Sequence, residues 1–364
     1  MKEPFNIQKY MSRGVAKVVA GSLIATATNK KEAAYMRFFA RSAFRASKKR
    51  AAAEKAGEHI PPFLIASITG RCNLHCAGCY SRANHTCGDR EPEQLMRAEE
   101  WDHIFAEAKE LGISYILLAG GEPMLRYDVL NAAAKYPDIL FPIFTNGTCL
   151  NDRYLALLNE HRNLLPVISI EGGKDATDAR RGTGVYDKVT EAMWRLKQNG
   201  MVFGTSVTVT KDNMHEVCSD GFAGELYEKG CRVIIFVEYV PADGESEHLA
   251  PGEPEQAWIQ RQVRALRRKN RRMVLISFPG DEKSSDGCVA AGRGFFHINA
   301  HGGAEPCPFS PYSDCNVRDS SIREALRSPL FYALNAQGLL KDDHIGGCTL
   351  YANRERVEQL INQS

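Results

Sequence analysis

The sequence predicts an α/β fold in which parallel strands form an incomplete barrel. Six apolar stretches indicate strands, at residues 63–68, 114–118, 139–145, 164–170, 202–210 and 231–240. Helical patterns separate them, and the first has a clear apolar face, made of Trp101, Ile104, Phe105, Ala108 and Leu111. Strands that alternate with helices of this length favour a parallel sheet with right-handed crossovers. Six such units give an incomplete barrel, because the closed form has eight.

Length and composition fit one large α/β domain, or such a domain with an extension. The chain has 364 residues, of which 44% are hydrophobic and 25% charged, enough for a sizeable core. The net charge of +2 provides no overall field that would attract nucleic acid. No signal peptide is evident, and the longest apolar stretch near the start, residues 15–26, is too short to span a membrane. We therefore expect a cytoplasmic protein.

The first part of the chain is predicted to be helical and basic. Residues 1–60 contain 13 Lys and Arg against 4 Asp and Glu. Between residues 6 and 57, apolar side chains such as Tyr35, Phe39 and Phe44 are interleaved with arginine and lysine. A basic amphipathic segment of this kind can lie on an anionic membrane surface, which gives peripheral membrane contact through residues 1–57. The alternative is that it packs on the following domain while its charges stay solvated.

Three cysteines follow the first predicted strand in the stretch RCNLHCAGCY, residues 71–80. Cys72, Cys76 and Cys79 form a C-x3-C-x2-C array, which favours metal ligation over disulfides in a chain without secretory features. Three thiolates from one loop suit a 4Fe–4S cluster with one iron open to a small molecule, because such clusters normally take four cysteines. A zinc site completed by Cys87 or His75 is the alternative.

This array resembles the radical S-adenosylmethionine (radical SAM) superfamily. The resemblance implies a partial (β/α)6 TIM-type barrel in which the open iron binds the amino and carboxylate groups of SAM. It further implies reductive cleavage of SAM to a 5′-deoxyadenosyl radical, which abstracts a substrate hydrogen. The family often has an aromatic residue before the third cysteine, whereas this chain has Gly78 there, with Tyr80 following. We assign Tyr80 to SAM binding.

The next two strand ends carry motifs that resemble the same family. The second strand is followed by Gly120, Gly121, Glu122 and Pro123, which match the GGEP motif that contacts the SAM amino group. A Gly-Gly pair alone would indicate only a turn that permits close backbone approach. The third strand ends in Thr-Asn-Gly, from which the resemblance places Asn146 in the site. Such positions are the expected ones, since α/β barrels carry their sites at the C-terminal ends of strands.

The fourth strand and the loop after it supply a further expected contact set. Ser169 and Glu171 stand where relatives have Ser-Leu-Asp-Gly, close to the ribose and carboxylate of SAM. Arg181 resembles an arginine that offers its planar fork to the SAM carboxylate. Arg180 is the alternative residue for this contact. If neither arginine binds SAM, each is a solvated charge on the protein surface.

The fifth and sixth strands complete the predicted site. Hydroxyl and apolar residues alternate along the fifth strand, so its hydroxyl side chains share one face. We expect Ser206 and Thr208, on that face, to lie near SAM. The backbone of the sixth strand at Val237 is expected beside the adenine. Glu238 and Tyr239 end that strand and are our candidates for catalytic residues that face the substrate.

A second cysteine group lies near the C-terminus, at Cys288, Cys307, Cys315 and Cys348. Gly302 makes the first part of it a C-x13-G-x4-C pattern, with a hairpin turn expected just before Cys307. The pattern resembles the SPASM and twitch extensions of radical SAM enzymes, which carry auxiliary iron–sulfur clusters. Four thiolates complete one closed 4Fe–4S cluster, and the full SPASM set of seven cysteines is absent. Structural zinc is the alternative.

Four segments follow from these patterns. We expect a basic helical segment at residues 1–60, the partial barrel at 61–250, a linking helix and strand at 251–280 and the auxiliary-cluster extension at 281–364. Residues 241–254 are rich in proline, glycine and acid, which suits a lid over the site.

The predicted function is radical chemistry initiated by SAM. We expect oxidative modification of a peptide or protein side chain, with the auxiliary cluster as electron acceptor and a flavodoxin or ferredoxin as electron donor. Radical modification of a lipid or another membrane-associated small molecule is one alternative. A non-catalytic iron–sulfur or zinc scaffold is the other, although a scaffold needs neither GGEP nor the Ser169 and Glu171 strand end.

Overall fold

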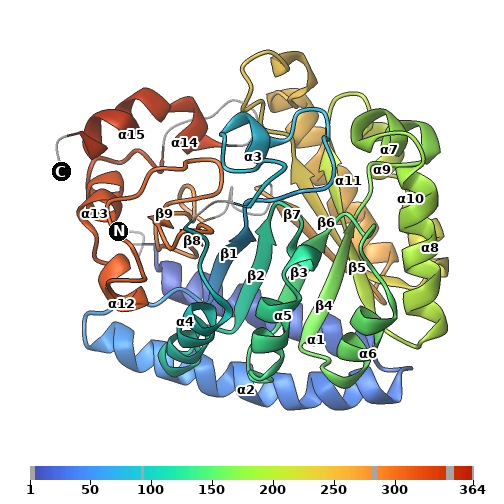
Figure 1. The fold of residues 1–364 in the computed structure, drawn as a ribbon, viewed down its shortest axis with the longest axis horizontal. Coiled ribbons are helices and arrows are strands. Elements are labelled where there is room, and N and C mark those ends of the chain that lie inside the picture. The colour runs from blue at the N-terminus through green and yellow to red at the C-terminus, as the bar shows by residue number, and fades with distance from the viewer. Residues whose placement is uncertain (1–4, 92–93, 280–284, 342–347, 363–364) are drawn as a thin grey trace.

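A mostly parallel, open sheet organises the computed structural model, which describes residues 5–91, 94–279, 285–341 and 348–362 (Figure 1). In the described parts of the chain the strand order is β7-β6-β5-β4-β3-β2-β1-β8-β9, and only the β8–β9 pair is antiparallel. The strands are β1 (Phe63–Thr69), β2 (Tyr115–Gly120), β3 (Phe141–Thr145), β4 (Leu164–Ser169), β5 (Phe203–Val209), β6 (Cys231–Glu238), β7 (Val274–Phe278), β8 (His297–Ile298) and β9 (Ala304–Glu305). The predicted α/β fold with an incomplete barrel is confirmed.

The six predicted strands are all present, each within about two residues of its expected bounds. Three further strands, β7 on one side and β8 with β9 on the other, extend the sheet at its edges. β7 pairs in parallel with β6, and β8 pairs in parallel with β1 through Ile65 and Ala66. The sequence pattern indicated a strand within residues 251–280 but not the edge that it joins. Both additions satisfy backbone groups that an exposed edge would leave unpaired.

Helices follow the strands and pack around the outer side of the sheet. α4 (Ala98–Leu111) buries the five side chains of its predicted apolar face, Trp101, Ile104, Phe105, Ala108 and Leu111. The other elements are α3 (Tyr80–Ala83), η1 (Pro123–Leu125), α5 (Tyr127–Ala134), α6 (Asp152–Glu160), α7 (Lys174–Arg181), α8 (Val185–Gln198), α9 (Met214–Val217), α10 (Asp220–Glu228), η2 (Glu247–Leu249), α11 (Glu253–Lys269), α12 (Ile322–Ala325), α13 (Pro329–Ala336), α14 (Thr349–Ala352) and α15 (Arg354–Ile361).

The basic N-terminal segment forms a hairpin of two long helices, α1 (Ile7–Ala25) and α2 (Lys30–Lys55). Asparagine side chains cap both helices, since Asn6 accepts from the Lys9 amide and Asn29 from the Glu32 amide. The hairpin runs beneath the starts of the strands, along the lower edge of Figure 1. Its apolar side forms a buried cluster near the starts of β2, β3 and β4, made of Val19, Met36, Phe39, Ala43 and Leu140, with Tyr115 and Leu165 against it.

Polar contacts fix the hairpin to this end of the barrel. The Arg50 guanidinium is buried and donates to the carbonyl of Gly112 and, at 3.2 Å, to Ser114 Oγ. Glu32 and Arg162 form a buried ion pair at 2.6 Å, with each side chain 8% exposed. One face of the segment therefore packs on the barrel, as the second of the two sequence-based alternatives requires. Its other face is exposed.

Candidate active site

The cysteine loop, residues 70–80, follows β1 at the edge where the parallel strands end. Backbone hydrogen bonds hold it from two sides, because the Cys72 amide donates to Gly88 O at 3.0 Å and the Ala77 amide to Arg180 O at 2.8 Å. Cys72, Cys76 and Cys79 are half-buried free thiols. The three predicted ligands thus lie on a loop that the protein's own backbone keeps in place.

Cys87, the alternative fourth ligand, lies beside Cys72. The segment that carries it runs along the cysteine loop, with the Gly88 amide donating to Gly70 O at 2.7 Å. A hydrogen bond from the Cys87 thiol lowers the pKa of Cys72 to about 6 and raises the pKa of Cys87 itself. Cys72 is therefore a thiolate near neutral pH, the form that binds metals.

Two arginines at the end of α7 make the surroundings of the loop cationic. Burial raises the pKa of the Cys76 thiol, and the charges of Arg181 and Arg180 oppose that effect. Nearby cations favour thiolates over thiols. An anionic group bound by the three cysteines would be stabilised at this position.

Glu171 connects these arginines to the strand ends. Its buried Oε1 accepts from Arg180 Nη1 at 2.6 Å and from Arg181 Nε and Nη2 at 2.8 and 2.5 Å. Its Oε2 accepts from the Thr208 amide at 3.0 Å, and Arg180 Nη1 also donates to Thr208 Oγ1 at 3.1 Å. Glu171, Arg181 and Thr208 are thus brought together as the sequence suggested. Two guanidiniums share one carboxylate, which leaves an excess positive charge.

Glu122 joins the ends of β2 and β3. It is fully buried, and it accepts hydrogen bonds from the Met124 amide, Thr145 Oγ1 and the Asn146 amide at 2.7–2.9 Å. Burial raises the pKa of Glu122 to about 7, and these three bonds oppose the rise. An ionised carboxylate has about four acceptor positions, so one remains for a ligand. Asn146 in turn donates to Asn73 of the cysteine loop at 2.9 Å.

The two glycines of the GGEP motif allow a close approach to protein backbone. A Cβ on Gly120, whose φ is +119°, would lie 2.2 Å from Thr69 O, and one on Gly121 would lie 2.0 Å from Arg71 O. The amides of Gly121 and Glu122 donate to those same carbonyls at 2.8 Å. We expected this freedom to serve a ligand; in the structure it lets β2 join the start of the cysteine loop.

Gly78 lies against a tyrosine side chain from the end of β6, which leaves no room for a Cβ at position 78. Its φ is +61°, and a Cβ there would lie 2.1 Å from Tyr239 Oη and 2.8 Å from Tyr239 Cζ. The Tyr239 hydroxyl is 2.6 Å from Ser246 Oγ, and Ser246 Oγ donates to Asp243 at 2.5 Å. Tyr239 is buried and thus ties the cysteine loop to the segment predicted as a lid.

The sheet register divides the remaining predicted residues between its two faces. Ser169 pairs with Ser206, and Thr208 pairs with Val237, so these four share one face. Glu238 lies on the opposite face with Ile234 and Phe236, which are fully buried where α10 packs on β6. The Glu238 charge raises the pKa of Cys218 on that side, after the larger effect of burial. The structure therefore does not bring Glu238 to the face that holds Ser169 and Ser206.

Tyr80 points toward the C-terminal extension. Its ring centroid lies 4.7 Å from that of Phe309, and the side-chain Nδ2 of Asn84 donates to Pro308 O at 3.4 Å. Burial raises the pKa of Tyr80, and the nearby charges of Cys79 and Cys307 add to this. Tyr80 thus stands between the two cysteine groups, and its assignment to SAM binding stays a prediction.

The extension contains the hairpin that the sequence predicted before Cys307, formed by β8 and β9. The Ala304 amide of β9 donates to Cys315 O at 2.8 Å, so Cys307 and Cys315 lie on neighbouring segments. The Cys288 amide donates to Leu340 O at 2.7 Å. Residues 342–347, just before Cys348, lie outside the described chain. Ligation of a metal by these four cysteines stays a prediction.

Sequence reasoning missed a buried histidine that joins the extension to β1. His297 of β8 lies between Glu305, whose Oε2 is 2.7 Å from Nδ1, and Ser67, whose Oγ is 2.7 Å from Nε2. Glu305 Oε1 also accepts from Asn299 at 2.6 Å. Alternate polar residues on a short strand were the available signal, but the partner Ser67 is 230 positions away.

The donor set around the cysteine loop fits an iron–sulfur cluster with three thiolate ligands. Cys72, Cys76 and Cys79 share one loop, the pKa of Cys72 is about 6, and two arginines lie beside it. In the residues that the structure describes, no three His, Cys, Asp or Glu side chains surround a common point as ligands of a single metal ion do.

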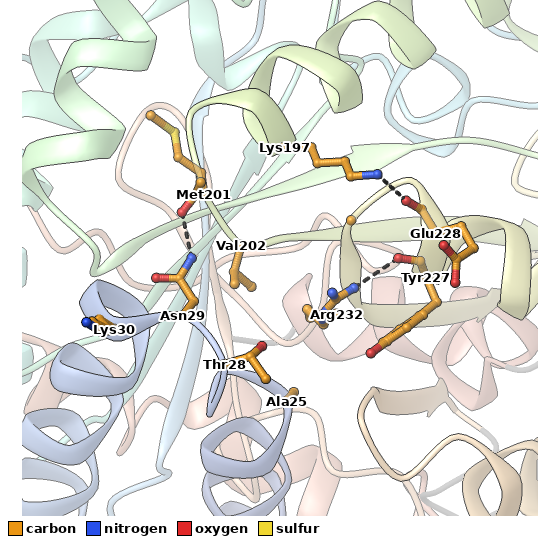
Figure 2. Close-up of a pocket in the computed structure, with 12 residues that line it drawn as sticks. Ala25, Thr28, Asn29, Lys30, Lys197, Met201, Val202, Tyr227, Glu228 and Arg232 are labelled. Atoms are coloured by element: carbon orange, nitrogen blue, oxygen red, sulfur yellow. Dashed lines mark hydrogen bonds between the residues drawn. The ribbon is translucent and has the colours of Figure 1, made fainter.

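A cavity lies away from the cysteine loop, at the other end of the barrel (Figure 2). It measures about 480 Å³ and is bounded by the turn of the N-terminal hairpin and by the residues just before β5 and β6. Three cations line it, Lys30, Lys197 and Arg232, together with Glu228.

A family model described as the radical SAM superfamily matches residues 66–219. The AdoMet-dependent heme synthase of Methanosarcina barkeri is 26% identical over 290 residues, which cover 72% of this chain and 81% of that protein. The PqqA peptide cyclase of Rhizobium meliloti is 26% identical over 300 residues, 76% of this chain and 75% of that protein.

Solved structures share the fold. SuiB of Streptococcus suis bound to S-adenosylmethionine superposes with a TM-score of 0.66 at 16% identity, over 84% of this chain and 77% of that one. The matched segment contains the cysteine loop and the ends of β2, β3, β4 and β5, where the polar network described above lies. Residues 66–219, which carry the cysteine loop and these strand ends, therefore match the radical SAM superfamily.

Proposed function

We propose that this protein is a radical SAM enzyme that oxidatively modifies a side chain of a peptide or protein. The observation that carries the proposal is the set of groups around the cysteine loop. Three thiols, a carboxylate with one acceptor position left and two arginines that share one carboxylate meet where the strands end.

These groups match the charges of SAM and of the cluster. Cys72, Cys76 and Cys79 would hold a 4Fe–4S cluster, which leaves one iron for SAM. Glu122 offers its remaining acceptor position to the SAM ammonium group, and the excess positive charge of Arg180 and Arg181 suits the SAM carboxylate. A cluster held there would supply the electron for reductive cleavage of SAM, which is the source of the radical that would abstract a substrate hydrogen.

The protein's own part is to position the ligands and to exclude water. Glu122 fixes the turn at Thr145 and Asn146, and Asn146 holds the cysteine loop through Asn73. Tyr239 covers Gly78 and contacts Ser246, so that the 241–254 segment lies over the loop. Tyr351 of α14 donates to Pro241 O at 2.6 Å, which links the C-terminal extension to the same segment.

A peptide or protein substrate is supported by several relatives. PqqA peptide cyclase is one, and the structure of SuiB with its precursor peptide SuiA also superposes with a TM-score of 0.66. We propose an auxiliary 4Fe–4S cluster at Cys288, Cys307, Cys315 and Cys348 as the electron acceptor, with Tyr80 and Phe309 between it and the first cluster. The electron that starts each cycle would come from a flavodoxin or ferredoxin.

A tetrapyrrole is the second candidate substrate, because the heme synthase of Methanosarcina barkeri matches 72% of the chain. A lipid substrate is less consistent with the geometry. The basic hairpin lies at the starts of the strands, whereas the cysteine loop lies at their ends. A membrane that contacted the hairpin would therefore be on the wrong side for the site.

The test is anaerobic reconstitution followed by dithionite and SAM. We expect 5′-deoxyadenosine, about eight iron and eight sulfide per chain, and no 5′-deoxyadenosine from Cys72→Ala. Cys307→Ala is expected to lose about half of the iron and still to form 5′-deoxyadenosine, because it changes only the auxiliary group. Bound zinc without 5′-deoxyadenosine would contradict the proposal and favour a scaffold.

A further inference from the structure

The exposed side of the N-terminal hairpin is strongly basic. Residues 5–53 contain eleven Lys and Arg, of which Arg50 is buried, and a single acid, Glu32. That acid is buried and paired with Arg162, so it does not reduce the charge of the exposed side. The rest of the chain is net acidic, since the whole chain carries only +2. The net positive charge of this protein is thus concentrated on the two helices of the hairpin.

Helical spacing places these charges on one surface. On α2, Arg37, Phe38, Arg41, Phe44 and Lys48 fall on one stripe, opposite to the buried Met36, Phe39 and Ala43. On α1, exposed Lys9, Arg13 and Lys17 lie opposite to the buried Val19. Val19 and Phe39 belong to the same cluster beneath the strands, so both basic stripes point away from the barrel. We call this surface the basic face.

Large apolar side chains are exposed on the basic face. Phe38 is 40% exposed, Phe44 61% and Ile24 56%, which makes them three of the six large apolar side chains exposed on the described chain. Lys48 Nζ lies 4.7 Å from the centre of the Phe44 ring. Exposed rings among cations are typical of helices that lie at the surface of a bilayer, where rings enter the headgroup region.

The cavity beside the hairpin turn extends the basic face at one end (Figure 2). Lys30 borders it from α2, while Lys197 and Arg232 donate to the carbonyls of Glu228 and Tyr227 at 2.7 and 3.0 Å. These cations lie at the same end of the barrel as the hairpin. They suit a phosphate headgroup at the rim of the contact.

We propose that the basic face docks on an anionic phospholipid bilayer. No described helix is both long and apolar enough to cross a membrane, so the contact is peripheral. Each lysine or arginine near an anionic surface contributes about fivefold to affinity. Docking in this way turns the cysteine loop away from the bilayer, toward substrates that arrive from solution. The proposal does not depend on the identity of the substrate.

The test is vesicle flotation of the reconstituted full chain. We expect it to float with vesicles of 30 mol% phosphatidylglycerol in phosphatidylcholine, to stay behind with phosphatidylcholine alone, and to be released by 0.5 M NaCl because salt screens the attraction. Arg37→Glu with Arg41→Glu is expected to lower the vesicle affinity at least 25-fold, and Phe38→Ser with Phe44→Ser is expected to lower it as well. Arg13→Gln with Lys17→Gln gives a milder second variant, also expected to weaken flotation.

Two control variants, one double and one single, separate a specific face from general charge or apolarity. Lys188→Glu with Lys211→Glu changes the net charge equally at exposed sites elsewhere, and Tyr332→Ser removes an exposed ring on α13; both should float like the parent. All variants should form 5′-deoxyadenosine normally. The proposal is overturned if the parent does not float, if Arg37→Glu with Arg41→Glu floats unchanged, or if the face binds DNA or heparin but no vesicles.

Discussion

Gly78 and Tyr239 show how one missing side chain determines the shape of a site. The glycine adopts a left-handed backbone conformation, with φ of +61°, and the tyrosine hydroxyl occupies the space of its absent Cβ. The sequence revealed the glycine as a departure from the usual aromatic residue. It did not reveal that the ring would come from β6, because that contact joins residues 161 positions apart.

Gly78→Ala is expected to destabilise the protein and to lower its iron content. The left-handed conformation costs an alanine about 1–2 kcal/mol, and the contact with Tyr239 adds to that cost. Thermal unfolding and iron per chain measure the two effects. Gly88→Ala, in the neighbouring segment with open space around it, should change neither. Adding Tyr239→Ala should restore part of the loss; if it does not, the two residues are not coupled.

Glu122 gives the site a dependence on pH near neutrality. Burial raises its pKa from 4.5 to about 7, so the carboxylate gains a proton as the pH falls through 7. We expect SAM affinity to fall by up to tenfold per pH unit below that point, because the protonated form loses its attraction for an ammonium group. Equilibrium binding between pH 6 and 8 measures this. Glu122→Gln should bind weakly at all these pH values, and an unchanged pH profile in that variant would assign the effect to another group.

The same shift has the opposite sign for folding. A carboxyl whose folded pKa is raised favours the folded state while it is protonated. Its contribution is fully present below pH 4.5 and is lost as the pH rises through about 7. The residue that binds best when ionised therefore stabilises the fold most when neutral.

At the scale of elements, the N-terminal hairpin illustrates why its helices could be predicted and the surface against which they pack could not. Each helix has a clear periodic pattern and an asparagine cap, and the segment predicted to be helical forms two helices. Amphipathicity alone leaves open whether the apolar face meets a membrane or the protein. The structure resolves this with Phe39 against Tyr115 and with the Glu32–Arg162 pair, which no local pattern reveals.

Glu32→Ala is expected to destabilise the protein by about 3–5 kcal/mol, because it leaves Arg162 buried without its carboxylate. Urea unfolding measures the loss. Glu32→Ala with Arg162→Ala should cost less than Glu32→Ala alone, since no buried charge is then left without a partner. Asp187→Ala, which breaks the exposed pair with Lys174, is the matched control and should cost about 1 kcal/mol or less. Equal losses for both pairs would show that burial of the first does not matter.

At the scale of the whole molecule, repeated alternation of strands and helices sufficed to predict the barrel and the edge that carries the site. Glu122, Asn146 and Glu171 were predicted from motifs at strand ends, and Thr208 was predicted from the alternation of hydroxyl side chains along the fifth strand. The face of the sheet on which a strand residue lies was harder to predict, because a shift of one residue moves a side chain to the other side of the sheet. Glu238 is such a case. His297 was missed because one of its two partners, Ser67, comes from a strand 230 positions away.

The pairing of β8 with β1 has a consequence for synthesis of the chain. His297 meets Ser67 across 230 residues, so the ribosome has to make all of them before the outer edge of β1 is covered. At about 5–20 residues per second, that interval lasts roughly 10–50 s. During it, the nascent barrel carries its first cysteines next to an unpaired strand, which is the stage at which a chaperone or a cluster-delivery protein would have the most exposed target.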